Sequence, residues 1–422
     1  MGLGVCYRAP LPRRGLLKKP VSVTTLWRQI SNLGLDVVQQ LGKPLTDWFS
    51  SREAGDRLWI GIVPFEEDIE FSVRDGHVRV SAKTSGAGPG YHELVVGLLD
   101  TLEKKAELAW TGDGEDGYGD DTEYRTRRDG AALRDVMARQ LSSIASVVVK
   151  RTGEGALLNM STEEVPSVRS FAASPLGEWS KEWLEHAALA EGDALLAMAE
   201  EFFPWWESGL TADNLAKFGR VVCWTAVRWV NPRTPDEEHA IRIALECFEQ
   251  AKRGDSRRIP EREVAELRKL LAGDRKTDVP PGPDGIGFRR HDFSVSLPGH
   301  WALQVPGYYH GELEDEGTSQ VYWFGDRSIR ASTLRFDTNR SQEDVLKSLL
   351  EGQGQAIENL SDGVIGAANT FWSDADECFV TLVCLVGRGS VCSLSFSHPD
   401  QQDRDWAIKV AATAKHRASE PA

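Results

Sequence analysis

Apolar and polar positions alternate most clearly on either side of the pair Asp75-Gly76. The apolar positions of this alternation are Ile69, Phe71, Val73, Val78, Val80 and Ala82. An Asp-Gly pair between two alternating segments is typical of a two-residue type I′ turn. Pairing Val73 with Val78 places the apolar residues of both strands on one face. The pattern therefore predicts an antiparallel hairpin, and the apolar run 58–65 predicts a further, central strand.

Helical spacing follows this hairpin. Leu94, Leu98 and Leu102 recur every four residues after a glycine-rich loop, and a second amphipathic helix is expected to begin at Asp129 as N-cap. Antiparallel strands backed by two helices predict an α+β domain over residues 21–150.

The region 151–272 carries a different pattern. From about Leu176 to Ala272 apolar residues recur at helical spacing, and prolines stand near the expected helix starts and ends. We find no clean repeat period, so a helical bundle is favoured over a solenoid.

A Pro- and Gly-rich linker is predicted at 273–287, because its sequence offers little that can be buried. In the domain 288–422, Phe293 to Leu297 alternates as a strand, and Ser341 to Asp344 predicts a capping box. The run Phe379 to Val386 is apolar on both faces and therefore predicts a central strand. The fold class expected is multi-domain α+β.

The segment Phe293 to Trp301 reads F-S-V-S-L-P-G-H-W. With the strands and helices expected after it, this segment resembles the PsbP-like fold over about residues 288–416, and is most similar to the bacterial DcrB branch and to the Eag-type adaptors of type VI secretion. The resemblance implies an α/β/α sandwich that binds other proteins and, in the adaptors, holds apolar effector helices. It implies no catalytic residues.

Charge and cysteine content narrow the function classes. The chain has 49 Lys and Arg against 64 Asp and Glu, a net charge of −15, which argues against nucleic acid as the main partner. Residues 1–20 are expected to be a disordered basic leader. No run of 18 apolar residues is present, so no membrane insertion is expected, and six cysteines without a CxxC pair favour a reducing, cytoplasmic location.

The loop Gly86, Gly88 and Gly90 is the first candidate site. A glycine-rich connection between a strand and a helix can hold a phosphate on its backbone N–H groups. The spacing matches neither GxGxxG nor GxxxxGK[ST], and a tight connection with Pro89 as the first helical residue explains the same residues. His92, one turn into the helix, is the first candidate for proton transfer, although no base partner is visible.

The acidic stretch around residue 118 is the second candidate site. Its carboxylates Asp113, Asp116, Asp120 and Asp121 could hold a hard cation such as Ca²⁺. The spacing is not that of an EF-hand, so a solvated loop is the alternative, and we predict no metal or other cofactor. No HExxH, GxSxG or SxxK motif is present, so no catalytic residues are predicted.

Partner binding is assigned to two further sets of residues. Trp205 and Trp206 belong to a tryptophan-rich stretch that forms either core or a protein-binding patch. Leu382 and Cys384 lie on one face of the central strand, which is a candidate docking surface if its helices leave it uncovered.

The function expected is that of a non-enzymatic cytoplasmic protein-binding protein. It would be an adaptor, chaperone or immunity-type partner, with a secreted effector or toxin as a possible partner. The alternative is an enzyme or nucleotide-responsive regulator that uses the Gly86 to Gly90 loop and His92. A purely structural scaffold is the third reading.

Overall fold

The protein was analysed as a computed structural model, which describes residues 2–14, 19–112, 118–151, 158–159, 172–274, 282, 285–314, 319–336, 339–351 and 354–416. These residues form two compact units. Unit 1 contains residues 1–227, 234–274 and 285–287, and unit 2 contains 228–233, 275–284 and 288–422. The chain is thus a multi-domain α+β protein. No helix in the described part of the chain is long and apolar enough to cross a membrane.

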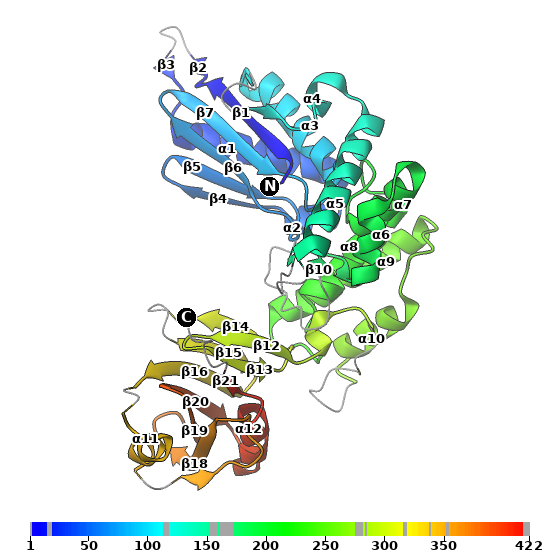
Figure 1. Ribbon diagram of the computed structural model, residues 1–422. Coiled ribbons are helices and arrows are strands. Elements are labelled where there is room, and N and C mark those ends of the chain that lie inside the picture. Colours follow the sequence, from blue (N-terminus) through cyan, green and yellow to red (C-terminus); the bar gives the residue numbers. More distant parts are fainter. Residues whose placement is uncertain are drawn as a thin grey trace. The chain divides into compact units, whose positions relative to one another are not determined.

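Unit 1 combines a mixed set of strands and helices (Figure 1). In chain order they are β1 (Gly4–Pro10), β2 (Arg13–Arg14), β3 (Lys19–Pro20), α1 (Val23–Leu41), α2 (Leu45–Trp48), β4 (Ser50–Ala54), β5 (Arg57–Gly61), β6 (Ile69–Arg74), β7 (His77–Lys83), α3 (Pro89–Ala106), β8 (Gly119–Asp120), α4 (Tyr124–Arg127), α5 (Gly130–Arg151), β9 (Leu158–Asn159), β10 (Ala172–Ser174), β11 (Gly177–Trp179), α6 (Lys181–Leu189), α7 (Gly192–Phe202), α8 (Ala212–Thr225), α9 (Pro235–Arg253) and α10 (Glu261–Leu271).

The main sheet of unit 1 has six strands in the order β4-β5-β6-β7-β1-β8. The hairpin prediction is confirmed: Val73 pairs with Val78 and Phe71 with Val80. Asp75 and Gly76 both have positive φ, 51° and 74°, as a type I′ turn requires. β5 lies inside the sheet, between β4 and β6, as its apolar sequence predicts, but it ends at Gly61, so residues 62–65 of the predicted strand belong to the β5–β6 connection.

The expectation of a disordered leader at residues 1–20 is wrong for Gly4–Pro10. These residues form β1, which lies between β7 and β8 and pairs with β7 along its whole length. Val5, Tyr7 and Ala9 are buried in the core. These three apolar residues alternate along the strand, and the basic residue between them, Arg8, points to the other face.

The helices of unit 1 begin as their sequences predict. Pro89 stands in the first turn of α3, and the Asp129 carboxylate accepts hydrogen bonds from the N–H groups of Ala131 and Ala132 before α5. Helices α1 and α3 contact each other, and α1 also contacts β5. The apolar face of the sheet, which includes Leu58 and Phe71, is buried and the opposite face carries polar and aromatic side chains.

Unit 2 is built around a seven-stranded sheet in the order β14-β15-β16-β20-β19-β18-β17, with a second sheet of β12-β13-β21. Its elements are η2 (Phe288–Arg290), β12 (Phe293–Leu297), β13 (Trp301–Val305), β14 (His310–Leu313), β15 (Ser319–Phe324), β16 (Arg327–Arg335), α11 (Gln342–Leu349), β17 (Gln355–Ala356), β18 (Ile365–Ser373), β19 (Cys378–Gly387), β20 (Ser390–His398), η3 (Gln401–Asp403), α12 (Arg404–Ala411) and β21 (Lys415–His416).

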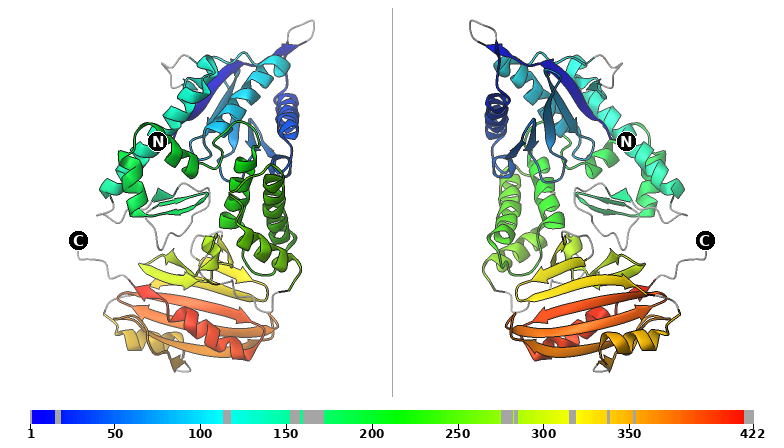
Figure 2. Two further views of the ribbon diagram at one scale, coloured as in Figure 1. Left: turned by 90° about the vertical axis from the view of Figure 1, so that its right-hand side faces the viewer. Right: turned by 90° about the vertical axis from the view of Figure 1, so that its left-hand side faces the viewer.

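Strand β19 is central, and each of its faces is covered by a different helix. Cys384 packs with Leu350 at the end of α11, whereas Val383 belongs to the core that contains Ala407 and Val410 of α12. Figure 1 shows α11 and α12 on opposite sides of the strands, and α12 crosses in front of them in the left view of Figure 2. The face that carries Leu382 and Cys384 is therefore not left uncovered, because side chains on alternate positions of β19 pack against different helices.

Candidate functional site

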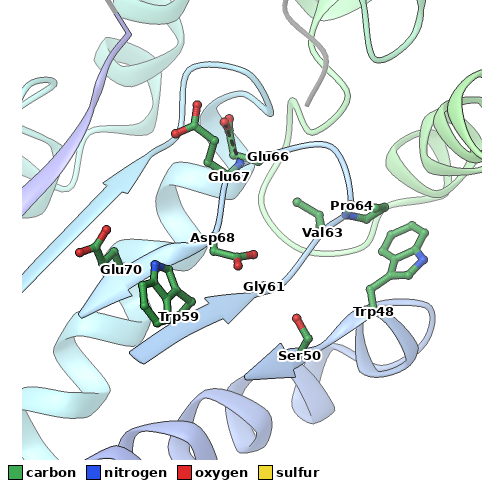
Figure 3. A pocket seen from close by; sticks show the side chains of 10 residues that line it. All are labelled: Trp48, Ser50, Trp59, Gly61, Val63, Pro64, Glu66, Glu67, Asp68 and Glu70. Atoms are coloured by element: carbon green, nitrogen blue, oxygen red, sulfur yellow. Dashed lines mark hydrogen bonds between the residues drawn. The ribbon is translucent and has the colours of Figure 1, made fainter. Parts of the chain in front are cut away.

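A cavity of unit 1 lies on the sheet face opposite α1 and α3. It has a volume of about 620 Å³. Its wall is formed by β4, β5, β6, the β5–β6 connection and the end of α2, through Trp48, Ser50, Trp59, Gly61, Val63, Pro64, Glu66, Glu67, Asp68 and Glu70. Figure 3 shows Trp59 and Trp48 at opposite ends of this pocket, with the Asp68 carboxylate between them. We call it the Trp48–Trp59 pocket.

A glycine keeps the floor of the pocket open. A Cβ atom at Gly61 would lie 2.6 Å from Ser50 Oγ and 2.9 Å from Asp68 Oδ1, both shorter than ordinary contacts. Any larger residue at position 61 would therefore push into the space in front of Asp68.

The carboxylates around the pocket differ in their partners. Glu67 forms an ion pair with Lys83 at 2.7 Å, and Glu70 faces Arg57 at 3.5 Å. Asp68 forms no hydrogen bond or ion pair within the described ranges, and its side chain is exposed. The pocket therefore presents one uncompensated negative charge at its centre.

The two tryptophans supply aromatic walls. The guanidinium carbon of Arg52 lies 4.5 Å from the ring centroid of Trp59, a cation–π contact. Trp48 packs against Phe65 and Phe218, with ring centroids 6.2 and 5.8 Å away. Trp59 already holds one cation against its ring, which shows that this end of the pocket suits a guanidinium group.

Glu66 joins the pocket to the buried glycine loop. Its side chain is buried, and its Oε2 atom accepts hydrogen bonds of 2.7 Å from the N–H groups of both Gly86 and Ala87. Burial raises the pKa of the Glu66 carboxyl above its usual value, against the opposing effect of these hydrogen bonds.

The Gly86 to Gly90 loop does not form a phosphate site in this conformation. All five residues are buried. The N–H groups of Gly86 and Ala87 donate to Glu66, that of Gly88 donates to the Thr84 carbonyl, and that of Gly90 donates to the Trp205 carbonyl. Pro89 has no N–H group. The Glu66 carboxylate thus already accepts the hydrogen bonds that these N–H groups would have to donate to a bound phosphate.

His92 has partners that the sequence did not reveal. Its ring is fully buried, with Nδ1 2.8 Å from Thr84 Oγ1 and Nε2 3.1 Å from Asp120 Oδ1. Thr122 Oγ1 lies 3.0 Å from the same Nε2 atom. The cluster joins a histidine to a carboxylate, as in a proton relay. Its side chains are buried, however, so a substrate cannot reach them.

The Asp120 carboxylate is stabilised in its ionised form. Burial by itself would raise its pKa, but the hydrogen bond and charge of His92 and the hydrogen bonds from Thr122 and Arg125 lower the pKa to about 2. Asp120 therefore contributes stability that is present above its usual pKa of 3.8 and is lost as the pH falls towards 2.

We expect Asp120→Asn to lower the free energy of unfolding at neutral pH by on the order of 2 kcal/mol. The difference between wild type and variant should shrink as the pH falls from about 4 towards about 2, because the wild-type carboxyl then becomes protonated in both states. Urea unfolding followed by tryptophan fluorescence at several pH values measures this difference. Asp36→Asn, an exposed carboxylate on α1, serves as the control, and a difference that stays constant down to pH 2 would contradict the interpretation.

The acidic stretch offers no cation site in the part that is described. Asp120 is committed to His92 and to local N–H groups, and Asp121 Oδ2 accepts a 2.9 Å hydrogen bond from the Gly4 N–H group. Asp113 and Asp116 lie outside the described residues. Among the described residues, no group of three or more His, Cys, Asp and Glu side chains could hold a metal ion.

The four candidate partner-binding residues are largely covered. Trp205 and Trp206 are buried in unit 1, which supports the reading of this stretch as core. Cys384 is buried beneath the end of α11, and Leu382 is half-buried beside it. None of them forms an open surface by itself.

The residues of the Trp48–Trp59 pocket were missed at the level of sequence. One signal was present: Trp59 stands between the apolar residues Leu58 and Ile60, so alternation places its ring on the polar face. The acidic run Glu66 to Asp68 follows the apolar run 58–65 in the sequence. Their meeting in one pocket depends on the path of the β5–β6 connection.

Comparisons with known proteins give little further information. No family model matches the chain, and no curated protein matches it. A crystal structure from Bacteroides thetaiotaomicron is similar at 15% identity and a TM-score of 0.25, covering 30% of this chain, which spans about half (48%) of that chain. The solution structure of cyanobacterial PsbP from Synechocystis is similar at 15% identity and a TM-score of 0.24, covering 32% of this chain and 97% of that one. The chain thus has a partial, weak likeness to a PsbP-like structure, and at these scores the likeness carries no argument about its function.

Proposed function

We propose that this chain is a non-enzymatic protein-binding protein whose unit 1 recognises a Lys or Arg side chain of its partner in the Trp48–Trp59 pocket. The observation that carries the proposal is the uncompensated Asp68 carboxylate between two tryptophans in a cavity of about 620 Å³. A carboxylate beside aromatic rings favours an organic cation through charge attraction and cation–π contact together.

The surroundings of the pocket support a cation over an anion or a metal ion. Glu67 and Glu70 are paired with Lys83 and Arg57, so Asp68 is the carboxylate left to attract a ligand, and the Arg52 guanidinium already stacks on Trp59. A metal ion prefers several oxygen ligands in a closed shell, whereas the Glu66, Glu67 and Glu70 carboxylates of this pocket already have hydrogen-bond or ion-pair partners. The net charge of −15 also attracts basic partners over long range.

The biological role proposed is that of an adaptor, chaperone or immunity-type partner acting in the cytoplasm. A secreted effector or toxin with exposed basic side chains would have the required chemistry. All six cysteines are free, which suits a reducing compartment. Membership of unit 2 in the DcrB or Eag-type branch is part of this proposal and rests on the Phe293 to Trp301 motif alone.

The pocket can be tested with a matched pair of small ligands. We expect Nα-acetyl-arginine amide to bind the full chain by isothermal titration, and Nα-acetyl-citrulline amide, its neutral isostere, to bind at least about fivefold more weakly. Asp68→Asn and Trp59→Ala should each reduce arginine-amide binding by a similar factor, and Asp75→Asn, an exposed carboxylate outside the pocket, should not.

Capture from the native cell then connects the pocket to a protein partner. The wild-type chain should retain a partner that is lost with Asp68→Asn. Equal binding of the arginine and citrulline amides, or a captured partner that is indifferent to Asp68→Asn and Trp59→Ala, would refute the proposed function.

A further inference from the structure

Strand β18 of unit 2 has an open edge along its second half. Its neighbour β17 pairs with it only at Ala367 and Ala368. The Ile357 N–H group donates to the Gly366 carbonyl, so Gly366 points its polar groups towards this edge. Because backbone groups alternate in direction along a strand, the N–H and C=O groups of Thr370 and Trp372 point to the same side. Beyond Ala368, no strand in the described part of unit 2 pairs with this edge.

Two aromatic side chains flank the open edge. Phe371 is 46% exposed and Trp372 is 48% exposed, and consecutive strand residues point to opposite faces of the sheet. The Trp372 ring contacts Phe379 of β19 edge-on, with centroids 5.0 Å apart. An added strand would therefore find an aromatic side chain beside it on each face.

The turn that follows β18 is acidic. Asp374, Asp376 and Glu377 are all exposed, and Asp376 is held by a hydrogen bond from Ser373 Oγ. Exposed hydrophobic edge strands are normally protected against unwanted pairing, often by charge. Here the charge is negative, so it disfavours an acidic segment and favours a basic one.

We propose that the open edge of β18 binds an extended segment of a partner protein in which apolar and basic residues alternate. The segment would add to the sheet as a further strand, with its backbone paired to Thr370 and Trp372, its apolar side chains against Phe371 or Trp372, and its basic side chains at the acidic turn. A second copy of this chain is a poorer occupant, because each copy carries a net charge of −15. This inference concerns unit 2 alone and does not rest on the Trp48–Trp59 pocket.

A synthetic peptide tests the inference directly. The probe is fluorescein-labelled Lys-Val-Lys-Val-Lys-Val-Lys amide, titrated with the full chain by fluorescence anisotropy. Two matched peptides serve as controls: one with proline in place of the central valine, which removes a backbone donor, and one with glutamate in place of every lysine. We expect each control peptide to bind at least about tenfold more weakly. Repeating the titrations with Asp68→Asn removes the central carboxylate of the unit 1 pocket from the measurement.

Substitutions at the edge locate the binding site. Trp372→Thr and Phe371→Thr keep a residue that suits a strand and should each weaken peptide binding by about tenfold. Leu334→Thr, at another exposed apolar residue (59%), should leave it unchanged. Circular dichroism establishes that each variant is folded, and Phe371→Ser replaces Phe371→Thr if the latter is not.

Three outcomes would overturn the inference. The first is equal binding of the proline peptide, which would show attraction by charge alone. The second is unchanged binding by both the Trp372 and Phe371 variants, which would place the peptide elsewhere. The third is a concentration-dependent dimer, measured by light scattering, that Trp372→Thr abolishes while the peptide fails to bind, which would assign the edge to a second copy.

Discussion

Replacing Glu66 by alanine is expected to lower the free energy of unfolding by about 2–5 kcal/mol. The Glu66 carboxylate accepts hydrogen bonds from two buried N–H groups, of Gly86 and Ala87, and alanine would leave both without this acceptor. A buried donor without an acceptor loses its hydration and gains nothing in return. Urea unfolding of the full chain, followed by tryptophan fluorescence, measures the loss.

Glu66→Gln is the matched control, because its amide oxygen can still accept both hydrogen bonds. We expect it to remain within about 1 kcal/mol of wild type at neutral pH. Burial raises the pKa of Glu66 above 4.5, so the folded state binds this proton more tightly than the unfolded state. Wild type should therefore lose stability relative to Glu66→Gln as the pH rises through the region above 4.5. Equal stability of the alanine and glutamine variants would show that the loop does not depend on this acceptor.

Gly90→Ala and Gly97→Ala are expected to change stability in opposite directions, although both glycines lie in α3. A Cβ atom at Gly90 would lie 2.3 Å from the Glu207 carbonyl oxygen and 2.3 Å from Trp205 Cδ1. The backbone must move to make room, and such overpacking costs about 1–3 kcal/mol. At Gly97 a Cβ atom meets nothing within 4 Å, so alanine should add about 0.5–1 kcal/mol by its higher helix propensity.

Comparing the two variants separates two effects on stability: the close contact of residues 203–207 with Gly90, and the higher helix propensity of alanine. Thermal unfolding by circular dichroism should show a lower Tm for Gly90→Ala and a higher Tm for Gly97→Ala than for wild type. A rise in Tm for both variants would contradict the contact between Gly90 and the 203–207 segment.

The sequence determined those features that depend on neighbouring residues. Asp75-Gly76 predicted a turn because both residues must adopt positive φ, and alternation fixed the pairing of Val73 with Val78. Asp129 predicted a helix start because its short side chain can accept hydrogen bonds from N–H groups of the next turn. The run Phe379 to Val386 is apolar on both faces, which predicted that its strand, β19, lies in the middle of the sheet. Each of these rests on backbone geometry within a few residues.

The candidate sites depended on contacts between distant residues, and only the tertiary structure decided them. The glycine loop looked open in the sequence, yet Glu66, 20 residues earlier than Gly86, takes its donors. Asp120 looked like a cation ligand, yet it lies against His92 on α3. β1 looked like part of a basic tail, yet it pairs with β7, more than 60 residues later. A carboxylate or an N–H group has many possible hydrogen-bond partners in a chain of this length. The partner that it meets depends on how the strands and helices pack together. The local sequence pattern does not encode that packing.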